Sequence, residues 1–399
     1  MIQRCRRAAL TVACAACVSA LGGAAADAQT PWVSGYLQTV PLFTGATPLT
    51  GSSVSGFNRF RLSTEPVLGP FSLEAAYEHA LTLRRRDAGA GVGVGGVPSG
   101  GEWLELDWTL AEEEHVLWRH RFDRLTIAWS PTQAMELSVG RQAVSWGTTL
   151  FLTPADPFLP FSPADPFRQF RGGVDSVRAR LYPGPLSQID LVVRPSRTEV
   201  GEEVTALGRG LTTWGNWEVS AWGGALYGDT TGAFGTAGGF GAWAVRGEGV
   251  VREVDGAVVF RGTIGVDRIL QVGGKDLFLV AEYQRDNLAA ADPAEYLALL
   301  QSAPFRRGEL QVLGRDETAV QASYQLHPLW GLAGLWLWNL NDRSALLSPS
   351  FAYSASDDVS LSGGIFFGLG DGAITPAQPV PSEFGLASNT GFLSLSWFF

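Results

Sequence analysis

The chain ends in "GFLSLSWFF", residues 391–399, and this stretch alternates with a period of two. Its apolar positions are Leu393, Leu395, Trp397 and Phe399, with Ser394 and Ser396 between them. Successive side chains of a β-strand point to opposite faces, so the pattern predicts a strand with one apolar and one polar face. A strand of an ordinary β-sandwich has the same period, but it does not need an aromatic residue at the carboxyl terminus.

A final strand of this kind resembles the C-terminal signal of bacterial outer-membrane β-barrels. The resemblance implies that Trp397 and Phe399 form an assembly signal that a barrel-assembly machinery recognises. It also implies that outer-membrane lipids and lipopolysaccharide surround the folded chain. We therefore expect the protein in the bacterial outer membrane.

The other end of the chain predicts export. Three arginines in residues 4–7 precede an apolar run, Ala8–Ala26, and Ala26-Asp27-Ala28 follows. This order of a positive, an apolar and an A-x-A region is typical of a cleaved signal peptide, here residues 1–28. A retained helix fits less well because a cleavage site follows at once, and a lipid-modified Cys14 or Cys17 fits less well because a leucine-led acceptor motif is missing.

The composition of the chain excludes some kinds of site and partner. All three cysteines (Cys5, Cys14 and Cys17) precede residue 29, so the exported chain has no disulfide framework and no thiolate metal site. Residues 29–399 hold 26 basic and 38 acidic residues, which gives a net charge of −12. Nucleic acid is therefore not an expected partner, because phosphate binding calls for clustered positive charge.

Most of residues 29–399 reads as strands of about ten residues that alternate in polarity, as in a transmembrane barrel. A soluble sandwich shares the alternation, but here nearly every segment has an apolar face and aromatic residues lie near the strand ends. We predict an all-β fold: a single antiparallel transmembrane β-barrel over residues 29–399, with about 16 strands and a range of 14–18. The alternation changes phase near Asp123, which predicts a bulge or a miscounted strand in that region.

Five stretches are predicted to be long external connections. They are residues 41–55, 84–101, 147–173, 287–315 and 370–385. The third contains "TPADPFLPFSPADPF", residues 153–167, in which the pentapeptide PADPF occurs twice.

Proline lacks an amide hydrogen and disfavours helix in the residue before it, so neither a helix nor a central strand is expected through residues 153–167. The phenylalanines nevertheless need burial. We predict that the loop 147–173 folds into the barrel mouth and narrows the pore. The residues that carry this prediction are Asp156, Phe158, Asp165, Phe167, Arg168 and Arg171, with Arg168 and Arg171 available to pair with Asp156 or Asp165. A loop packed over the rim, or one that binds a partner, is the alternative.

The residues around this loop resemble a porin-like group of bacterial outer-membrane proteins, in the general style of alginate-export and related channel barrels. A strand ends in GRQ-x-x-x-WG, the proline- and aspartate-rich loop follows, and the next strand opens on G-V-D-x-V-R. The resemblance covers residues 139–195. It implies an outer-membrane channel but no particular solute.

Strand parity directs a mixed set of polar side chains into the lumen, including Arg141 and Gln142 through a bulge at Gly140. The expected lumen residues are Arg59, Arg61, Arg141, Gln142, Arg178, Arg180, Asp190, Arg194, Arg246, Arg261 and Glu282. Rings of arginine favour anions, whereas opposed arginine and acidic ladders give weak selectivity. The mixture of arginine and acidic residues predicted here does not decide between anion selectivity and weak selectivity.

The expected function is passive diffusion of small hydrophilic solutes, anions among them, through a porin-like channel. A plugged barrel that serves as a receptor, export partner or scaffold is the alternative. A transporter of hydrophobic solutes is a third reading, which Trp222, Phe278 and Phe366 on the lumen face favour only weakly. We predict no enzyme, no metal and no cofactor, because the four histidines match no HExxH or GxSxG pattern and His120 lies among arginines.

Overall fold

Alternating strands build nearly all of the protein, which is described here from a computed structural model. The structure describes residues 33–83, 101–158, 167 and 171–399. The predicted signal peptide, residues 1–28, lies outside the described residues. Residues Ser34–Phe399 form one compact unit.

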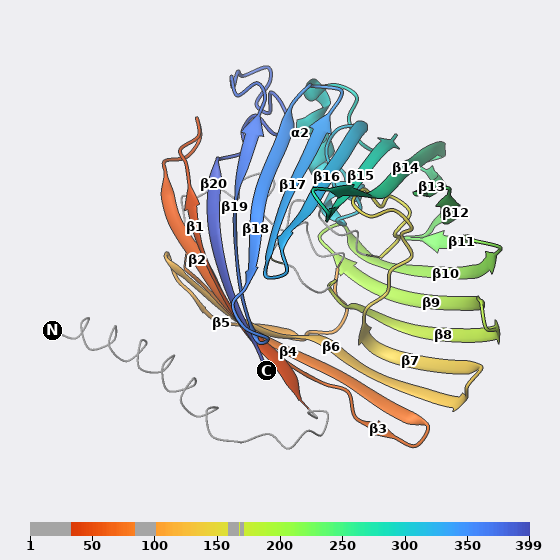
Figure 1. Cartoon of the computed structure of the whole chain (residues 1–399). Helices are drawn as coiled ribbons and strands as arrows, with labels where there is room; N and C mark the ends of the chain where they lie inside the picture. The colour runs from red at the N-terminus through yellow and green to blue at the C-terminus, as the bar shows by residue number, and fades with distance from the viewer. Residues whose placement is uncertain (1–32, 84–100, 159–166, 168–170) are drawn as a thin grey trace. The chain divides into compact units, whose positions relative to one another are not determined.

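Eighteen strands of this unit close an antiparallel barrel, because each pairs with its two neighbours and β1 pairs with both β2 and β20. Figure 1 shows them following one another around the ring. They are β1 (Ser34–Thr44), β2 (Ser53–Thr64), β4 (Phe71–Leu83), β6 (Val116–Thr132), β7 (Met135–Gln142), β8 (Val174–Gly184), β9 (Ser187–Thr198), β10 (Gly201–Trp214), β11 (Trp217–Leu226), β12 (Asp229–Phe240), β13 (Trp243–Val254), β14 (Ala257–Val272), β15 (Lys275–Asp286), β16 (Asp316–His327), β17 (Trp330–Asn339), β18 (Ala345–Ser354), β19 (Val359–Leu369) and β20 (Thr390–Phe398).

Two short strands lie outside the ring. β3 (Val67–Leu68) pairs with β4, and β5 (Asp107–Glu112) pairs with the edge of β6. One connection contains a 3-10 helix, η1 (Pro293–Glu295), and two short helices, α2 (Tyr296–Gln301) and α3 (Ala303–Arg306). In the described part of the chain, no helix combines the length and apolar character needed to cross a membrane.

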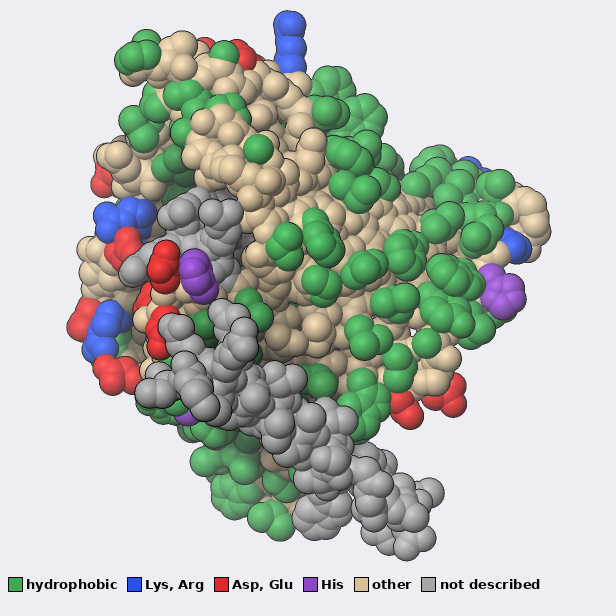
Figure 2. All heavy atoms as spheres, turned by 90° about the vertical axis from the view of Figure 1, so that its left-hand side faces the viewer, with side chains coloured by type: hydrophobic (Ala, Val, Ile, Leu, Met, Phe, Trp, Pro, Cys, Tyr) green, Lys and Arg blue, Asp and Glu red, His purple; other side chains and the backbone are tan. Residues whose placement is uncertain are grey.

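The two faces of the wall differ in polarity as the alternation predicts. In β20, Leu393 and Leu395 are 46% and 50% exposed, whereas Ser394 and Ser396 are 4% and 3% exposed. The apolar side chains therefore point outward and the polar ones inward, which is the arrangement of a barrel in lipid. Figure 2 shows hydrophobic side chains spread over one side of the outer wall.

The two ends of the barrel differ in the length of their connections. Both ends of the unit lie with the short turns, such as residues 215–216 and 273–274. The long connections meet at the opposite end, and they are residues 45–52, 84–115, 143–173, 287–315 and 370–389. Four of the five predicted long stretches fall at this end, and residues 84–100 of the remaining one lie outside the described residues. The first is shorter than predicted, because β1 and β2 extend further into it.

The strand number of 18 is at the upper limit of the predicted range, and the central value of 16 was too low. Alternation alone gives too few strands, because glycine, alanine and threonine on the outer faces of β10 and β12 weaken the apolar signal.

The predicted phase change in β6 is a β-bulge at Asp123. Ala76 pairs with Arg124 and Tyr77 pairs with Phe122, so Asp123 has no partner across β4. The extra residue points its carboxylate to the inside, where Asp123 accepts a 2.7 Å hydrogen bond from Arg61 and a 3.0 Å bond from Arg124. The bulge therefore puts two consecutive charged side chains in the same buried cluster.

Substituting Gly140 by alanine should destabilise the barrel. Gly140 has φ +121°, and a Cβ there would lie 2.1 Å from the Leu125 carbonyl oxygen. We expect a loss of roughly 1–3 kcal/mol in the free energy of unfolding, measured by urea titration of the refolded barrel. Gly210→Ala is the control, because a Cβ at Gly210 meets no atom within 4 Å. Equal stability of the two variants would contradict a steric requirement for glycine at position 140.

Candidate pore and its inward loop

The connection after β7 enters the barrel and packs against the inner wall. Trp146 and Phe158 are buried, and their rings meet edge to face at 5.0 Å. The Trp146 indole N–H donates a 2.9 Å hydrogen bond to Asp190 Oδ2, which projects inward from β9. The same apolar cluster contains Val192 and Trp222 from the inner faces of β9 and β11. This segment therefore lies inside the lumen.

Two glutamates of the wall hold the backbone of this loop. Glu248 of β13 accepts hydrogen bonds from the backbone N–H groups of Thr148 (2.6 Å), Thr149 (3.1 Å) and Ala155 (3.0 Å). Glu282 of β15 accepts from Leu150 (2.6 Å), Phe151 (3.0 Å) and Leu152 (2.9 Å). Irregular backbone that leaves water needs acceptors for its N–H groups, and these carboxylates supply them.

Within the loop, Asp156 is a buried centre of charge. It accepts a 2.7 Å hydrogen bond from Ser145 Oγ and forms an ion pair with Arg171. Burial raises the pKa of the Asp156 carboxyl, and the Arg171 guanidinium opposes that rise. The pair joins the start and the end of the loop, as the sequence suggested for Arg171. Asp165 and Arg168 lie outside the described residues.

Phe167 fixes the loop to the opposite wall. Its ring packs edge to face on Phe57 of β2 at 5.5 Å and on Phe392 of β20 at 4.8 Å. Arg59 of β2 donates a 2.9 Å hydrogen bond to the Phe167 carbonyl oxygen. Because β2 and β13 lie on opposite sides of the ring, the loop is anchored across the barrel.

Two further connections contribute to this inner structure, and sequence reasoning did not foresee them. In residues 287–315, the Gln311 side chain accepts a 2.6 Å bond from Thr153 N and donates a 2.8 Å bond to the Phe151 carbonyl. In residues 370–389, Glu383 accepts bonds from the backbone N–H groups of Leu313 and Gly314. Their signals were weak: "ELQVL" at residues 309–313 alternates like a short strand, and an isolated glutamate in a long loop predicts no contact.

Most predicted lumen arginines lie inside the barrel, each beside a carboxylate of a neighbouring strand or, for Arg61, of the next strand but one. The pairs are Arg59 with Glu78 (3.5 Å), Arg61 with Asp123 (2.7 Å), Arg178 with Asp190 (2.8 Å), Arg180 with Glu136, Arg246 with Asp267 (3.0 Å) and Arg261 with Asp286 (2.9 Å). Arg194 is buried as well, and it donates to the Phe158 carbonyl oxygen and to the Tyr227 hydroxyl. Local pairing therefore offsets much of the positive charge of this wall.

The prediction for Arg141 was wrong. Its guanidinium forms a 2.8 Å bond to Asp175 and a 2.7 Å bond to the Leu104 carbonyl, so it lies in the wall beneath residues 101–106. The register explains this, since Arg141 pairs with Leu125, which shares a face with the exposed Ile127. Gln142 is buried and bonds to Ser138 and to the Ser176 carbonyl rather than to the loop.

The histidine and aspartate of "RHRFDR" do not come together. His120 lies among Tyr77, Trp108 and His79, whereas Asp123 bonds to Arg61 on the inside. At the end of the chain, the Phe399 carbonyl oxygen accepts a 2.9 Å bond from Gly35 N, and the Phe399 ring lies 5.3 Å from that of Trp397. The role of these two residues in assembly stays a prediction.

Replacing both Glu248 and Glu282 by glutamine should loosen the loop without opening the barrel. Each glutamine keeps one acceptor oxygen but turns an NH₂ group toward N–H donors, and each charge-assisted bond lost costs roughly 1.5–3 kcal/mol. We expect faster hydrogen exchange for the peptide 143–158, measured by mass spectrometry of the folded protein. Glu136→Gln, at the Arg180 pair on the wall, is the matched control and should leave that exchange unchanged. Slow exchange in the double variant would show that the carboxylates do not hold the loop.

No protein-family model and no curated protein matches the sequence. Solved structures do match the fold. A BenF-like porin from Pseudomonas fluorescens Pf-5 is 10% identical, with a TM-score of 0.58 over 92% of this chain and 98% of that one. Acinetobacter baumannii OccAB1 is 9% identical, with a TM-score of 0.56 over 92% and 96%. Pseudomonas aeruginosa OpdK, solved with vanillate, is 9% identical, with a TM-score of 0.53 over 92% and 98%. Together with the closed eighteen-strand ring, these likenesses show that the chain has the fold of the outer-membrane porins.

Proposed function

We propose that this protein is an outer-membrane channel for passive diffusion of small hydrophilic solutes, narrowed by the loop 147–173. The supporting observation is the position of the loop, which Glu248 and Glu282 hold on one wall and Arg59 and Phe392 hold on the other. A loop anchored in this way narrows the pore but leaves a path through the barrel. The likeness of the barrel fold to a BenF-like porin, OccAB1 and OpdK supports the same proposal.

The apolar outer face and the short turns give the orientation of the channel. Short turns face the periplasm and long loops face the outside in barrels of this kind. Lipids of the outer membrane then surround the wall, with lipopolysaccharide next to the long-loop end. The barrel-assembly machinery remains the expected partner of Trp397 and Phe399 during insertion.

A plugged barrel is the second candidate, because three connections meet inside the mouth. Buried apolar residues from all three of them, Leu152, Val312 and Phe384, share one cluster with inner-wall residues such as Val40 and Leu337. If this packing seals the bore, the long loops would act as a receptor or scaffold instead.

Planar-bilayer conductance of the refolded chain 29–399 separates these functions. We expect single-channel currents, and larger currents after deletion of residues 153–170, because the deletion removes the narrowing segment. Deletion of residues 46–51, in the connection between β1 and β2, is the control and should leave the conductance close to that of the wild type. Absence of current from both the wild type and the 153–170 deletion would overturn the channel and favour the plugged barrel.

Ion selectivity should be weak, because carboxylates accompany the lumen arginines. In a KCl gradient we expect a reversal potential near zero for the wild type. Asp267→Asn leaves Arg246 without its partner and should shift the potential toward chloride, whereas Arg246→Gln should shift it toward potassium. Identical potentials for the two variants would show that this pair does not face the ion path.

A further inference from the structure

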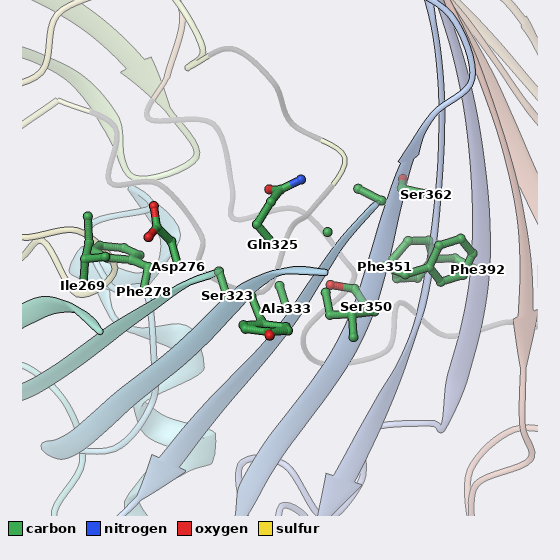
Figure 3. A pocket seen from close by; sticks show the side chains of 14 residues that line it. Ile269, Asp276, Phe278, Ser323, Gln325, Ala333, Ser350, Phe351, Ser362 and Phe392 are labelled. Carbon is green, nitrogen blue, oxygen red and sulfur yellow. The ribbon is translucent and has the colours of Figure 1, made fainter. Parts of the chain in front are cut away.

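A second inner surface lies in the half of the barrel nearer the short turns. A cavity of about 550 Å³ opens on the inner faces of β14–β20. Figure 3 shows Ile269 and Phe278 toward one end of it and Phe392 at the other, with Ser323, Ala333 and Ser350 between them. Its volume lies within the range of ordinary small-molecule sites.

The lining of this cavity is almost uncharged. Hydroxyl groups come from Ser323, Ser350 and Ser362 on three different strands. Among the residues that line the cavity, Asp276 is the one with a formal charge. The cavity thus differs from the wall of β2–β15, where arginines and carboxylates face the lumen in pairs.

One end of the cavity exposes an apolar patch to the lumen. Ile269 and Phe278 are paired across β14 and β15, and Ile269 is 59% exposed. Both share the strand face of inward residues, since Asp267 and Val280 on that face are buried. Lipid therefore does not cover this patch, and an exposed apolar patch in a polar lumen indicates a surface that binds something.

The other end is rigid and joined to the inward loop. Phe392 is buried, packs on Phe366 at 5.6 Å and on Phe167 at 4.8 Å, and also lines the cavity. The two ends lie on different parts of the ring, β14–β15 and β20, so each offers its own apolar surface to a ligand with a flat apolar body. The serines between them suit hydroxyl groups on that body.

We propose that this cavity binds a small uncharged solute that carries a ring and hydroxyl groups, such as an aromatic alcohol. The inference rests on the proposed channel function and adds a solute class to it. An anion of the same shape finds the Asp276 carboxylate at the cavity, and none of the lining residues offers it a guanidinium. The neutral molecule packs on Ile269 and Phe278 and exchanges a hydrogen bond with Ser323, which pairs with Phe278 across β15 and β16.

A matched pair of probes tests the proposal: 4-hydroxybenzyl alcohol and its anionic counterpart, 4-hydroxybenzoate. Binding to the refolded chain 29–399 in detergent is measured by titration calorimetry, and transient current block is measured in bilayers with the probe on the short-turn side. We expect the alcohol to bind about tenfold more tightly than the benzoate and to shorten the open time of the channel. Equal affinities, or no heat with the alcohol, would overturn the proposal.

Three variants locate the site. Ala333→Phe fills the floor of the cavity and should weaken alcohol binding about tenfold or more. Ser350→Arg adds a guanidinium and should reverse the preference, so that the benzoate binds more tightly. Ala281→Phe, an exposed position on the outer face of β15, is the control for an added aromatic ring and should not change binding. Unaltered alcohol binding in Ala333→Phe, with normal conductance as evidence of folding, would place the site elsewhere and refute the proposal.

The two readouts separate this inference from the channel itself. Currents without alcohol binding would leave the channel standing and refute the solute site. Alcohol binding that Ala333→Phe abolishes, in a barrel that carries no current, would support the site and refute the channel.

Discussion

Two carboxylates determine how the interior of this barrel is organised. Glu248 and Glu282 together accept six backbone N–H groups of the inward loop. A loop of irregular structure inside a barrel would otherwise leave these donors without acceptors, at a cost of roughly 1–3 kcal/mol for each buried group. The prolines of residues 153–167 lower the number of N–H donors that need an acceptor, because proline carries no N–H. Glutamates on the wall and prolines in the loop therefore both limit the number of buried N–H groups without an acceptor.

Neutralisation between neighbouring strands is the second organising feature. Arg178 with Asp190, Arg246 with Asp267 and Arg261 with Asp286 each join two adjacent strands across the inner face. Arginine suits this task because its planar fork can bond to one carboxylate through two nitrogens, as Arg178 and Arg261 do. Since each pair bridges a strand boundary, the same contacts that neutralise the lumen also fix the strand register.

The sequence predicts the fold and the two faces of the wall because both depend on a local alternation. It predicts the change of phase near Asp123 for the same reason, since the one extra residue of the bulge shifts the phase of all that follow. β10 was missed because small residues on its outer face leave little apolar signal, although its pairing with β9 and β11 is regular. Arg141 was assigned to the lumen through a presumed bulge at Gly140. Its pairing with Leu125 instead puts it on the face of Ile127, where residues 101–106 cover it.

The loop contacts were harder to predict than the wall. The run of phenylalanines indicated burial, and the pairing of Asp156 with Arg171 could be foreseen from their closeness in sequence. Glu248 and Glu282 were recognisable as inward residues, but nothing local shows that they bind the backbone of a segment about a hundred residues away. Gln311 and Glu383 belong to other connections, so their contacts exist only once the ring has closed.

The interior is asymmetric, and the asymmetry follows from the ring order of the strands. Charged pairs occupy β2–β15, whereas the inner faces of β16–β19 near the short turns carry serine, alanine, glycine and glutamine. The inward loop joins the two regions, because Glu248 holds one part of it and the Phe392 ring holds Phe167. The loop therefore lies between a charged surface on one side of the lumen and an uncharged, partly apolar surface on the other, and a solute of the proposed channel would meet both. Such a bore can select by the distribution of polarity over a molecule as well as by its size or net charge.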